Sequence, residues 1–255
     1  MAPSQREKTG QRRFGLCMTV IADLAAAVAL LTMPVGSLGR IAGLWDWRTM
    51  LRMFGIGLNA TAAAIVLALA AFVVSRKLPW RSYRLAGATL AFVVGVAVMV
   101  PQAATALRAM RAPPIHDITT DTDNPPQLVA LLAERTAVHA LNGADYTAAT
   151  AVLQKTYFPD IAPKVLPLPQ HDAFERVLAG VRAQGWRVAA AVPEEGRIEA
   201  VASTFWIGFN DDIVFRLTAI GPNQTRVDMR SISRVGRGDT GTNAARVRAF
   251  LAALG

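Results

Sequence analysis

The sequence predicts an α-helical transmembrane bundle followed by an α+β domain. Three apolar stretches in the first half each reach the ~20 residues that cross a bilayer as a helix, and they cover residues 14–39, 53–74 and 85–107. The second half instead shows a helical pattern, four stretches in which apolar and polar residues alternate, and a final helical pattern. We therefore predict three transmembrane helices within residues 1–111, and a four-stranded antiparallel sheet with flanking helices within residues 112–255.

The composition limits the classes of partner. Hydrophobic residues make up 53% of the 255 residues, and the formal net charge is +9. Such a charge in a soluble protein suggests nucleic acid, but here much of it flanks the apolar stretches, and the chain has no nucleic-acid-binding motif. We therefore expect no nucleic-acid partner. Cys17 is the single cysteine, which excludes an intrachain disulfide and a cysteine-based zinc site.

Basic residues near the apolar stretches predict the orientation in the membrane, because lysine and arginine are enriched in cytoplasmic loops. They are most concentrated in the N-terminal tail and in the second connection, at Arg6, Lys8, Arg12, Arg13, Arg76, Lys77, Arg81 and Arg84. This pattern places the N-terminus in the cytoplasm and, with three spans, the C-terminal domain on the other side. We expect a multi-pass protein of the cell inner membrane with a periplasmic C-terminal domain.

Two features of the apolar stretches concern contacts inside the membrane. Gly87, Ala91 and Gly95 recur every four residues and form a small-residue face that lets helices approach closely. This face fits either a compact bundle or a homo-oligomer. Asp23 lies within the first stretch. Either its protonated carboxyl is hydrogen-bonded to a neighbouring backbone or hydroxyl group, or it belongs to a proton or ion pathway.

The C-terminal half begins with a proline-containing linker and then shows alternating helical and strand patterns. Apolar periodicity predicts three helices before the last one, at residues 128–135, 146–157 and 173–184. A first hairpin joins residues 186–192 to residues 197–206. The helix at 173–184 and the last helix can cover one face of the sheet. The other face would carry part of the arginine surface, and we expect it to be partly open, or closed against the membrane helices or a partner.

The second hairpin contains most of the clustered charge. Its strands alternate over residues 212–219 and 226–230, and Gly221-Pro222-Asn223 is the predicted loop. The loop sets these neighbours across the strands: Arg216 opposite Asp228, Val214 opposite Arg230, and Asp212 diagonal to Arg230 and Arg234. Opposite charges on neighbouring strands contribute roughly 0.2–1 kcal/mol each. One interpretation is therefore a solvated ladder of ion pairs.

A second interpretation concerns the segment after this hairpin. Arg230, Arg234 and Arg237 lead into a glycine-rich turn and then a helix capped by Thr242 or Asn243. The first amide groups of a helix carry partial positive charge, so a helix start beside arginines can bind an anion. Asp239 in the turn could occupy the anion position itself. The predicted ligand-binding residues are Arg216, Arg230, Arg234, Arg237, Thr242 and Asn243.

We predict no catalytic, metal or cofactor site. No serine stands in the Gly-x-Ser-x-Gly elbow of hydrolases, and no histidine has a visible relation to the serines. Asp211 and Asp212 are adjacent on a strand and point to opposite faces, so they do not form an acid–base pair. Residues 121–124 begin like a calcium loop, but the required glycine and terminal glutamate are missing. We interpret these acids as turn and cap residues.

Three segments of the C-terminal half resemble the DUF1499 family, a domain of unknown function. They are YFPDIAP, DDIVFRL and RSISRVGRGDTGTNAARVRAFL. Many members carry a Pro-Asn-Cys-Val-type segment at the domain entrance, whereas this chain has IHDITTDTDNPP there, so any role of that thiol is absent. The Gly43-Leu44-Trp45 segment also resembles members with several preceding membrane helices. The resemblance implies a fold and a membrane-anchored form, but almost no biochemistry.

Together these features lead to a functional hypothesis of binding rather than catalysis. The expected protein is a membrane-anchored extracytoplasmic binding domain whose ligand is anionic, such as a lipid headgroup, a cell-envelope component or an acidic protein surface. Membrane lipids and a membrane-protein partner are the other expected contacts. Two alternatives stay open. A hydrolase-like envelope enzyme would need a deep pocket with a perturbed acid or histidine beside the arginines, and a structural subunit would pack against a larger membrane complex.

Overall fold

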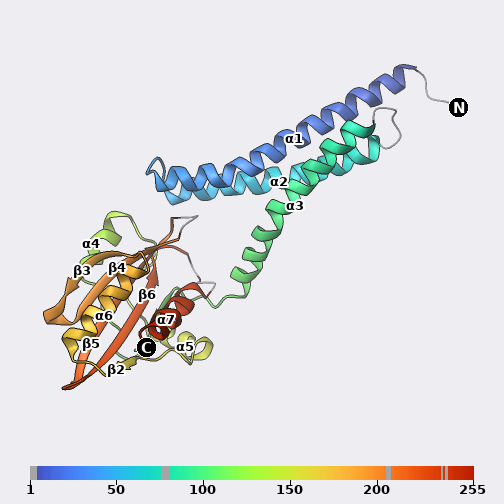
Figure 1. Ribbon diagram of the computed structural model, residues 1–255. Helices are drawn as coiled ribbons and strands as arrows, with labels where there is room; N and C mark the ends of the chain where they lie inside the picture. The colour runs from blue at the N-terminus through green and yellow to red at the C-terminus, as the bar shows by residue number, and fades with distance from the viewer. Residues whose placement is uncertain (1–4, 76–80, 205–207, 237, 239–240) are drawn as a thin grey trace. The chain divides into compact units, whose positions relative to one another are not determined.

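A computed structural model describes residues 5–75, 81–204, 208–236, 238 and 241–255 (Figure 1). The chain divides into two compact units, mainly between Leu107 and Arg108. The first unit contains helices α1 to α3, and the second contains the sheet and the remaining helices.

The first two helices pack through small residues. They are α1 (Gln5–Ile41) and α2 (Trp47–Ser75). Their buried contact consists mainly of alanines, namely Ala22, Ala26, Ala64, Ala68 and Ala71. At Gly57 of α2 an added Cβ would lie 2.1 Å from the hydroxyl oxygen of Thr32 in α1, so only glycine fits there. Such residues let helix backbones approach closely where no hydrophobic driving force separates helix from lipid.

Trp45 closes the short connection between these helices. Its indole Nε1–H donates a hydrogen bond to the carbonyl oxygen of Gly36, at 2.9 Å. Its ring covers Gly39 so closely that an added Cβ would lie 1.9 Å from a ring carbon. The Gly-Leu-Trp segment therefore has a structural role, because it fixes the turn between α1 and α2.

The third helix, α3 (Arg81–Arg111), uses its small residues within the chain. Ala91 is buried among the alanines of α1 and α2. An added Cβ at Gly95 would lie 2.7 Å from a side-chain carbon of Ile65 on α2. Gly87 lies in the same helix, outside the residues whose surroundings are described. The predicted small-residue face thus contributes to a compact bundle.

Two helical segments, Leu16–Ile41 and Trp47–Val73, are long and apolar enough to span a membrane. Their large apolar side chains point outward, and the most exposed are 60–64% exposed: Leu24, Leu31, Leu38 and Val66. Such a surface indicates membrane association. In α3 the corresponding apolar run, Thr89–Pro101, is shorter than a span. Two of the three predicted helices therefore have the length and composition of a membrane span, and the third span is not confirmed. Asp23 is exposed on α1 and makes no hydrogen bond or ion pair with a described residue.

The second unit is built on one antiparallel sheet of six strands, so the prediction of four strands is wrong. The strand order is β1-β6-β5-β4-β3, and β2 also pairs with β6. The strands are β1 (Asp117–Thr119), β2 (Lys164–Leu166), β3 (Arg187–Val192), β4 (Arg197–Ser203), β5 (Asn210–Gly221) and β6 (Gln224–Ser233). The missed strands, β1 and β2, have three residues each, which is too short for alternation to be visible in the sequence.

The predicted register of the long hairpin is confirmed. Arg216 lies opposite Asp228, and Val214 lies opposite Arg230. Asp212 lies opposite Ile232, which leaves it diagonal to Arg230 and Arg234 as expected. The other predicted hairpin joins β3 to β4 through the short helix η1 (Pro193–Glu195) and Gly196, whose φ of +61° favours glycine.

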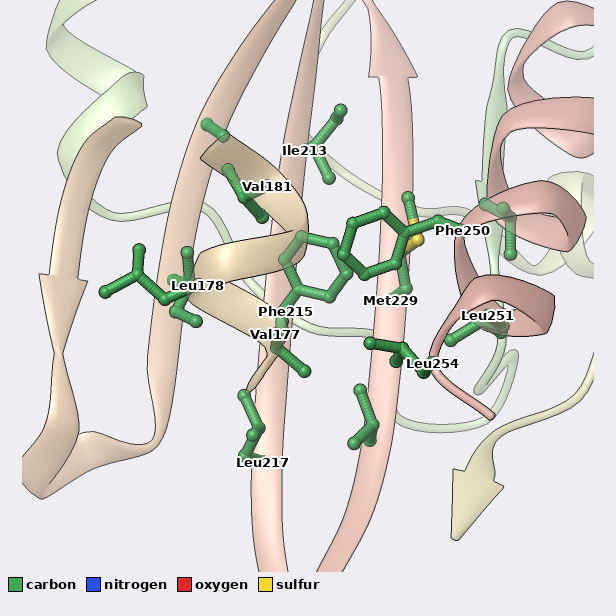
Figure 2. Close-up of a cluster of buried hydrophobic side chains, with 14 of the residues drawn as sticks. Val177, Leu178, Val181, Ile213, Phe215, Leu217, Met229, Phe250, Leu251 and Leu254 are labelled. Atoms are coloured by element: carbon green, nitrogen blue, oxygen red, sulfur yellow. The ribbon is translucent and has the colours of Figure 1, made fainter. Parts of the chain in front are cut away.

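One face of the sheet is apolar and is covered by α6 (Gln170–Ala183) and α7 (Thr242–Ala253), as predicted. Figure 2 shows Val177 and Val181 of α6 and Phe250 of α7 directed toward Phe215 and Met229 of the sheet. The ring centroids of Phe215 and Phe250 are 4.8 Å apart. Burial of this cluster supplies the main hydrophobic stabilisation of the domain.

The second face is covered by the chain's own entrance segment, residues 120–147. This segment contains α4 (Ala130–Ala137), and its Leu128 and Leu131 pack on Val214 and Ile232 of the sheet. The helix that follows, α5 (Ala148–Tyr157), closes the outer edge of β1, because the Gln154 amide bonds both backbone groups of Thr119. The expected partly open surface is therefore limited to Arg216 and Arg226, which are 27% and 37% exposed, whereas Arg230 and Arg234 are buried.

Candidate functional site

Arg230 is buried and ion-paired at the centre of the closed sheet face. Its side chain is 0% exposed, and its Nε and Nη2 donate to the two carboxylate oxygens of Asp117 at 2.9 and 2.7 Å. The remaining donors reach the carbonyl oxygens of Pro126 at 3.1 Å and Ala144 at 2.6 Å. The guanidinium also lies over the ring of Tyr146, 5.6 Å from its centroid. Four of the five N–H groups of Arg230 are used in these bonds, so this fully buried side chain fastens the entrance segment to β6.

Arg234 belongs to a second buried cluster on the same face. Its Nη2 lies 2.6 Å from Asp212 and 3.0 Å from Glu134, and Arg135 donates to the other oxygen of Asp212 at 2.5 Å. Burial would raise the pKa of Glu134, but hydrogen bonds from Arg187 and Arg234 hold that pKa below its ordinary value. The Nη1 of Arg234 is buried and has no hydrogen-bond partner among the described residues.

Arg216 is partly exposed and is also neutralised by carboxylates. Its Nη2 lies 2.9 Å from Asp228 and 3.0 Å from Asp121, and Arg226 pairs with the same two acids at 3.0 and 2.7 Å. Burial would raise the pKa of Asp121, but the Asn124 amide and the guanidinium of Arg226 keep it below the ordinary value of 3.8. The interpretation of an ion-pair ladder therefore fits the pairing, although the ladder is largely buried rather than solvated.

The start of α7 differs from the prediction. Gly241, with a φ of +94°, precedes the helix without a side-chain cap, and Thr242 is the first helical residue. Asn243 is fully buried: it accepts a hydrogen bond from Ser231 at 2.6 Å and donates one to Ser233 at 2.9 Å. The prediction that Thr242 or Asn243 caps the helix is therefore wrong, since Asn243 joins the helix to β6 instead.

The predicted anion site is not assembled by the described residues. Successive side chains of a strand point to opposite faces, so the two arginines of the Arg-Ser-x-Ser-Arg motif face the entrance segment while its two serines face α7. Arg230 and Arg234 therefore lie on the opposite face from Asn243. Arg237, the last predicted arginine, lies outside the described residues.

A carboxylate of the chain itself occupies a helix start on the closed face. Glu199 of β4 is fully buried and accepts hydrogen bonds from the first amides of α4, those of Val129, Ala130 and Leu131, at 2.9–3.1 Å. Helix N-termini favour anions, and here the anion is a side chain from a distant strand. The role of Glu199 could not be predicted from the sequence, because nothing local in residues 128–135 indicates a cap about 70 residues away.

A groove on the other side of the domain has a different character. It has a volume of about 230 Å³ and lies between α7 and the segment that leads into β2. Its lining consists of Asp160, Ile161, Ala162, Pro163, Lys164, Val247, Arg248, Leu251 and Ala252. Ile161, Leu251 and Ala252 give the groove an accessible apolar surface, whereas Val247 is fully buried.

Arg248 and Asp160 form a clasp across this groove. Arg248 donates to the two carboxylate oxygens of Asp160 at 2.5 and 2.6 Å and lies over the ring of Phe158, 5.5 Å from its centroid. The hydrogen bonds from Arg248 hold the pKa of Asp160 below its ordinary value, so this acid is ionised at neutral pH. The clasp fixes the 158–164 segment beside α7.

Lys164 is the cation of the groove that has no counterion. Its side chain makes no ion pair or hydrogen bond with any described residue, whereas Arg248 of the same groove is matched by Asp160. Sequence analysis did not single out Lys164. The available signal was indirect: the YFPDIAP segment, which carries part of the resemblance, ends one residue before Lys164 and forms one wall of the groove.

Residues 117–254 match a family described as "Protein of unknown function (DUF1499)". The chain belongs to the DUF1499 family. The suspected resemblance is thereby confirmed. The match begins at the first residue of β1 and ends directly after α7, so the DUF1499 domain contains both sheet faces and the groove, while α1 to α3 lie outside it. No curated protein matches the chain.

In the described part of the DUF1499 domain, no group of three or more histidine, cysteine, aspartate or glutamate residues is arranged to hold a metal ion. Asp211 and Asp212 point to opposite faces, where they pair with Arg246 and with Arg234 respectively. The groove beside α7 combines open volume with a lysine side chain that no described carboxylate pairs with.

Proposed function

We propose that this protein is a membrane-anchored binding protein whose DUF1499 domain holds an anionic ligand in the groove beside α7. The ligand has an apolar part that lies on Ile161 and Leu251 and a negative charge that pairs with Lys164. Lipids and cell-envelope components at the membrane surface are the candidate sources. The proposed site thus differs from the arginine set expected from the sequence, because the described arginines of that set are matched by carboxylates.

The observation that carries this proposal is an unpaired lysine at the rim of an apolar groove. The described domain pairs Arg216, Arg230 and Arg234 with acids, so its buried charges are already balanced. Lys164 is partly buried and has no such acid. A partly desolvated cation gains most from a ligand that brings both a counterion and apolar surface to cover it.

We further propose that α3 is a third membrane span, with the N-terminus in the cytoplasm and the DUF1499 domain on the periplasmic side of the inner membrane. The length of α3, 31 residues, and the concentration of basic residues in the tail and the second connection support this topology. An odd number of spans puts the two ends of the chain on opposite sides.

Cysteine labelling in intact cells tests the topology. With Cys17 replaced by alanine, Lys155→Cys on exposed α5 should react with a membrane-impermeant maleimide, and Gly10→Cys should react only after lysis. Labelling of both positions from the same side would contradict the third span.

Titration of the full chain tests the proposed site. The protein is held in nanodiscs of zwitterionic lipid, and hexyl phosphate, hexanoate and neutral 1-hexanol are added while methyl NMR signals of Ile161 and Leu251 are followed. At least one of the two anions should shift these signals more strongly than hexanol does. The affinity should fall at higher salt, because a partly exposed lysine is screened.

The matched variants are Lys164→Gln and Lys155→Gln, which make the same chemical change inside and outside the groove. Lys164→Gln should weaken anion binding about tenfold or more, and Lys155→Gln should leave it unchanged. Equal binding by wild type and Lys164→Gln would remove the groove as the site.

A further inference from the structure

We propose that the ligand of this groove is an aliphatic monocarboxylate with about six carbon atoms in the bound part. This inference rests on the proposed function and names the ligand class for the same site. It draws on the charge of the groove lining, on the groove's volume and on its apolar surface.

The charges of the lining select a single negative charge. Lys164 and Arg248 contribute two positive charges and Asp160 contributes one negative charge, which leaves the groove with a net charge of +1. A monoanion neutralises this charge. A phosphate monoester, with close to two negative charges at neutral pH, would place its second charge beside the Asp160 carboxylate. Like charges at such a site oppose binding, so Asp160 acts as the element that selects against dianions.

The volume of the groove limits the length of the apolar part. At about 30 Å³ for each atom, the share of a water molecule in the liquid, about 230 Å³ accommodates roughly eight non-hydrogen atoms. Hexanoate, with six carbons and two oxygens, has this size. Longer chains leave their ends in solvent or lipid, so additional methylenes add nothing inside the groove.

The apolar surface explains why a chain is needed beside the carboxylate. Ile161 is partly exposed and Leu251 is 8% exposed, and both line the groove. Each methylene that leaves water should tighten binding about threefold to fourfold. Acetate reaches only the charged rim, so it should bind far more weakly than hexanoate.

The decisive experiment is a chain-length series on the full chain in zwitterionic nanodiscs, with acetate, butanoate, hexanoate, octanoate and decanoate as probes. The methyl signals of Ile161 and Leu251 report occupancy of the groove, and empty nanodiscs report partition into lipid. We expect affinity to rise from acetate to hexanoate and then to level off. A rise that continues equally through decanoate would indicate partition into the bilayer and would overturn the inference.

Two pairs of variants test the charge argument. Lys164→Gln should lower the affinity for hexanoate about tenfold or more and leave any weak affinity for 1-hexanol unchanged. Lys155→Gln should change neither affinity. Asp160→Asn should raise the affinity for hexyl phosphate relative to hexanoate, and Asp123→Asn, an exposed acid away from the groove, should not. Dispersed methyl spectra of each variant confirm that it is folded. The conservative variant Asp160→Glu keeps the negative charge, so it should keep the wild-type preference for hexanoate over hexyl phosphate.

The outcomes separate this inference from the proposed function. If hexyl phosphate binds in the groove more tightly than hexanoate and depends on Lys164, the proposed site stands and the monocarboxylate is wrong. If neither anion shifts the groove methyl signals, both fail. If hexanoate binds, depends on Lys164 and shows the limit at about six carbons, both are supported.

Discussion

The closed sheet face and the groove beside α7 use cations in opposite ways. On the sheet face, Arg230 and Arg234 are buried beneath the entrance segment and are matched by Asp117 and Asp212. In the groove, Lys164 stands at the rim of an open cavity without a carboxylate partner among the described residues. The difference shows that a concentration of arginines in a sequence indicates charge, whereas the arrangement of acids around it decides whether that charge holds the fold or meets a ligand.

The closed sheet face contains a structural polar layer. This layer is stable only when each buried charge keeps its partner. Buried ion pairs contribute little over an apolar replacement, but removal of one partner leaves an uncompensated charge at large cost. The layer also orders the entrance segment, because Arg230 and Glu199 bond its backbone groups directly. The layer therefore adds buried hydrogen bonds to the apolar contacts that Leu128 and Leu131 of this segment make with the sheet.

The largest effect is expected from Arg230→Met, which keeps most of the side-chain volume and removes the charge. It should lower the free energy of unfolding of the domain by about 3–5 kcal/mol, since Asp117 stays buried without a counterion. Adding Asp117→Leu should recover only part of the loss, because the carbonyl groups of Pro126 and Ala144 still lack donors, each at about 1–3 kcal/mol. Pulse proteolysis in urea measures both variants. Full recovery in the double variant would show that the carbonyl bonds contribute nothing.

The next effect concerns the cap of α4. Glu199→Gln removes the negative charge that accepts the first amides of this helix and should cost about 1.5–3 kcal/mol. Hydrogen exchange of residues 129–131 should accelerate. Glu195→Gln is the matched control, because Glu195 pairs with the same Arg197 but is 57% exposed, and it should cost about 0–1 kcal/mol. Similar losses in the two variants would contradict the capping role.

As the pH falls, the contacts on the closed sheet face should lose stability before those on the apolar face. The pKa values of Asp121 and Glu134 are lower in the folded protein than their ordinary values of 3.8 and 4.5. At pH values between the folded and the ordinary pKa of each group, the unfolded chain binds more protons than the folded domain. The stability that these two carboxylates contribute is therefore fully present above pH ~5 and is lost as pH falls through the folded pKa values. Asp121→Asn should cost about 1 kcal/mol at neutral pH and should flatten the acid side of a stability profile. A profile as steep as that of wild type would contradict the assignment, and Asp123→Asn is the exposed control.

The smallest effect on stability is expected at the groove. Lys164→Gln removes a charge that no carboxylate of the described residues balances, so the free energy of unfolding should change by less than about 0.5 kcal/mol. Arg226→Gln, which leaves Asp121 and Asp228 with fewer counterions, should be clearly destabilising. Thermal unfolding of the two variants under one condition makes this comparison. An equal loss of stability in both would contradict the claim that the groove charge is unpaired and the sheet-face charge is structural.

The sequence predicted the elements whose periodicity extends over several residues. The alternation in β5 and β6 gave the register of the long hairpin and the pair Arg216–Asp228 correctly, because a period of two leaves little freedom once the loop is placed. The same alternation predicted that α6 and α7 share one face, through residues such as Val177 and Phe250. These features depend on neighbours along the chain.

The features that the sequence did not predict depend on distant contacts. Lys164–Leu166 forms a strand only because it pairs with residues 225–227 of β6. Glu199 caps a helix 68–70 residues before it. The pattern of residues 128–135 predicts a helix in the entrance segment, but a local pattern does not indicate which sheet face the helix covers. The position of this segment over the arginines therefore could not be inferred from the sequence. The groove likewise arises only when the 158–164 segment meets α7.

The most direct test measures hexanoate binding in wild type, Lys164→Gln and Arg226→Gln, using the groove methyl signals of the full chain in nanodiscs. The account predicts that Lys164→Gln loses affinity about tenfold or more with unchanged stability, and that Arg226→Gln keeps affinity with reduced stability. The reverse pattern, with binding lost in Arg226→Gln and retained in Lys164→Gln, would place the ligand on the arginine face and contradict the account.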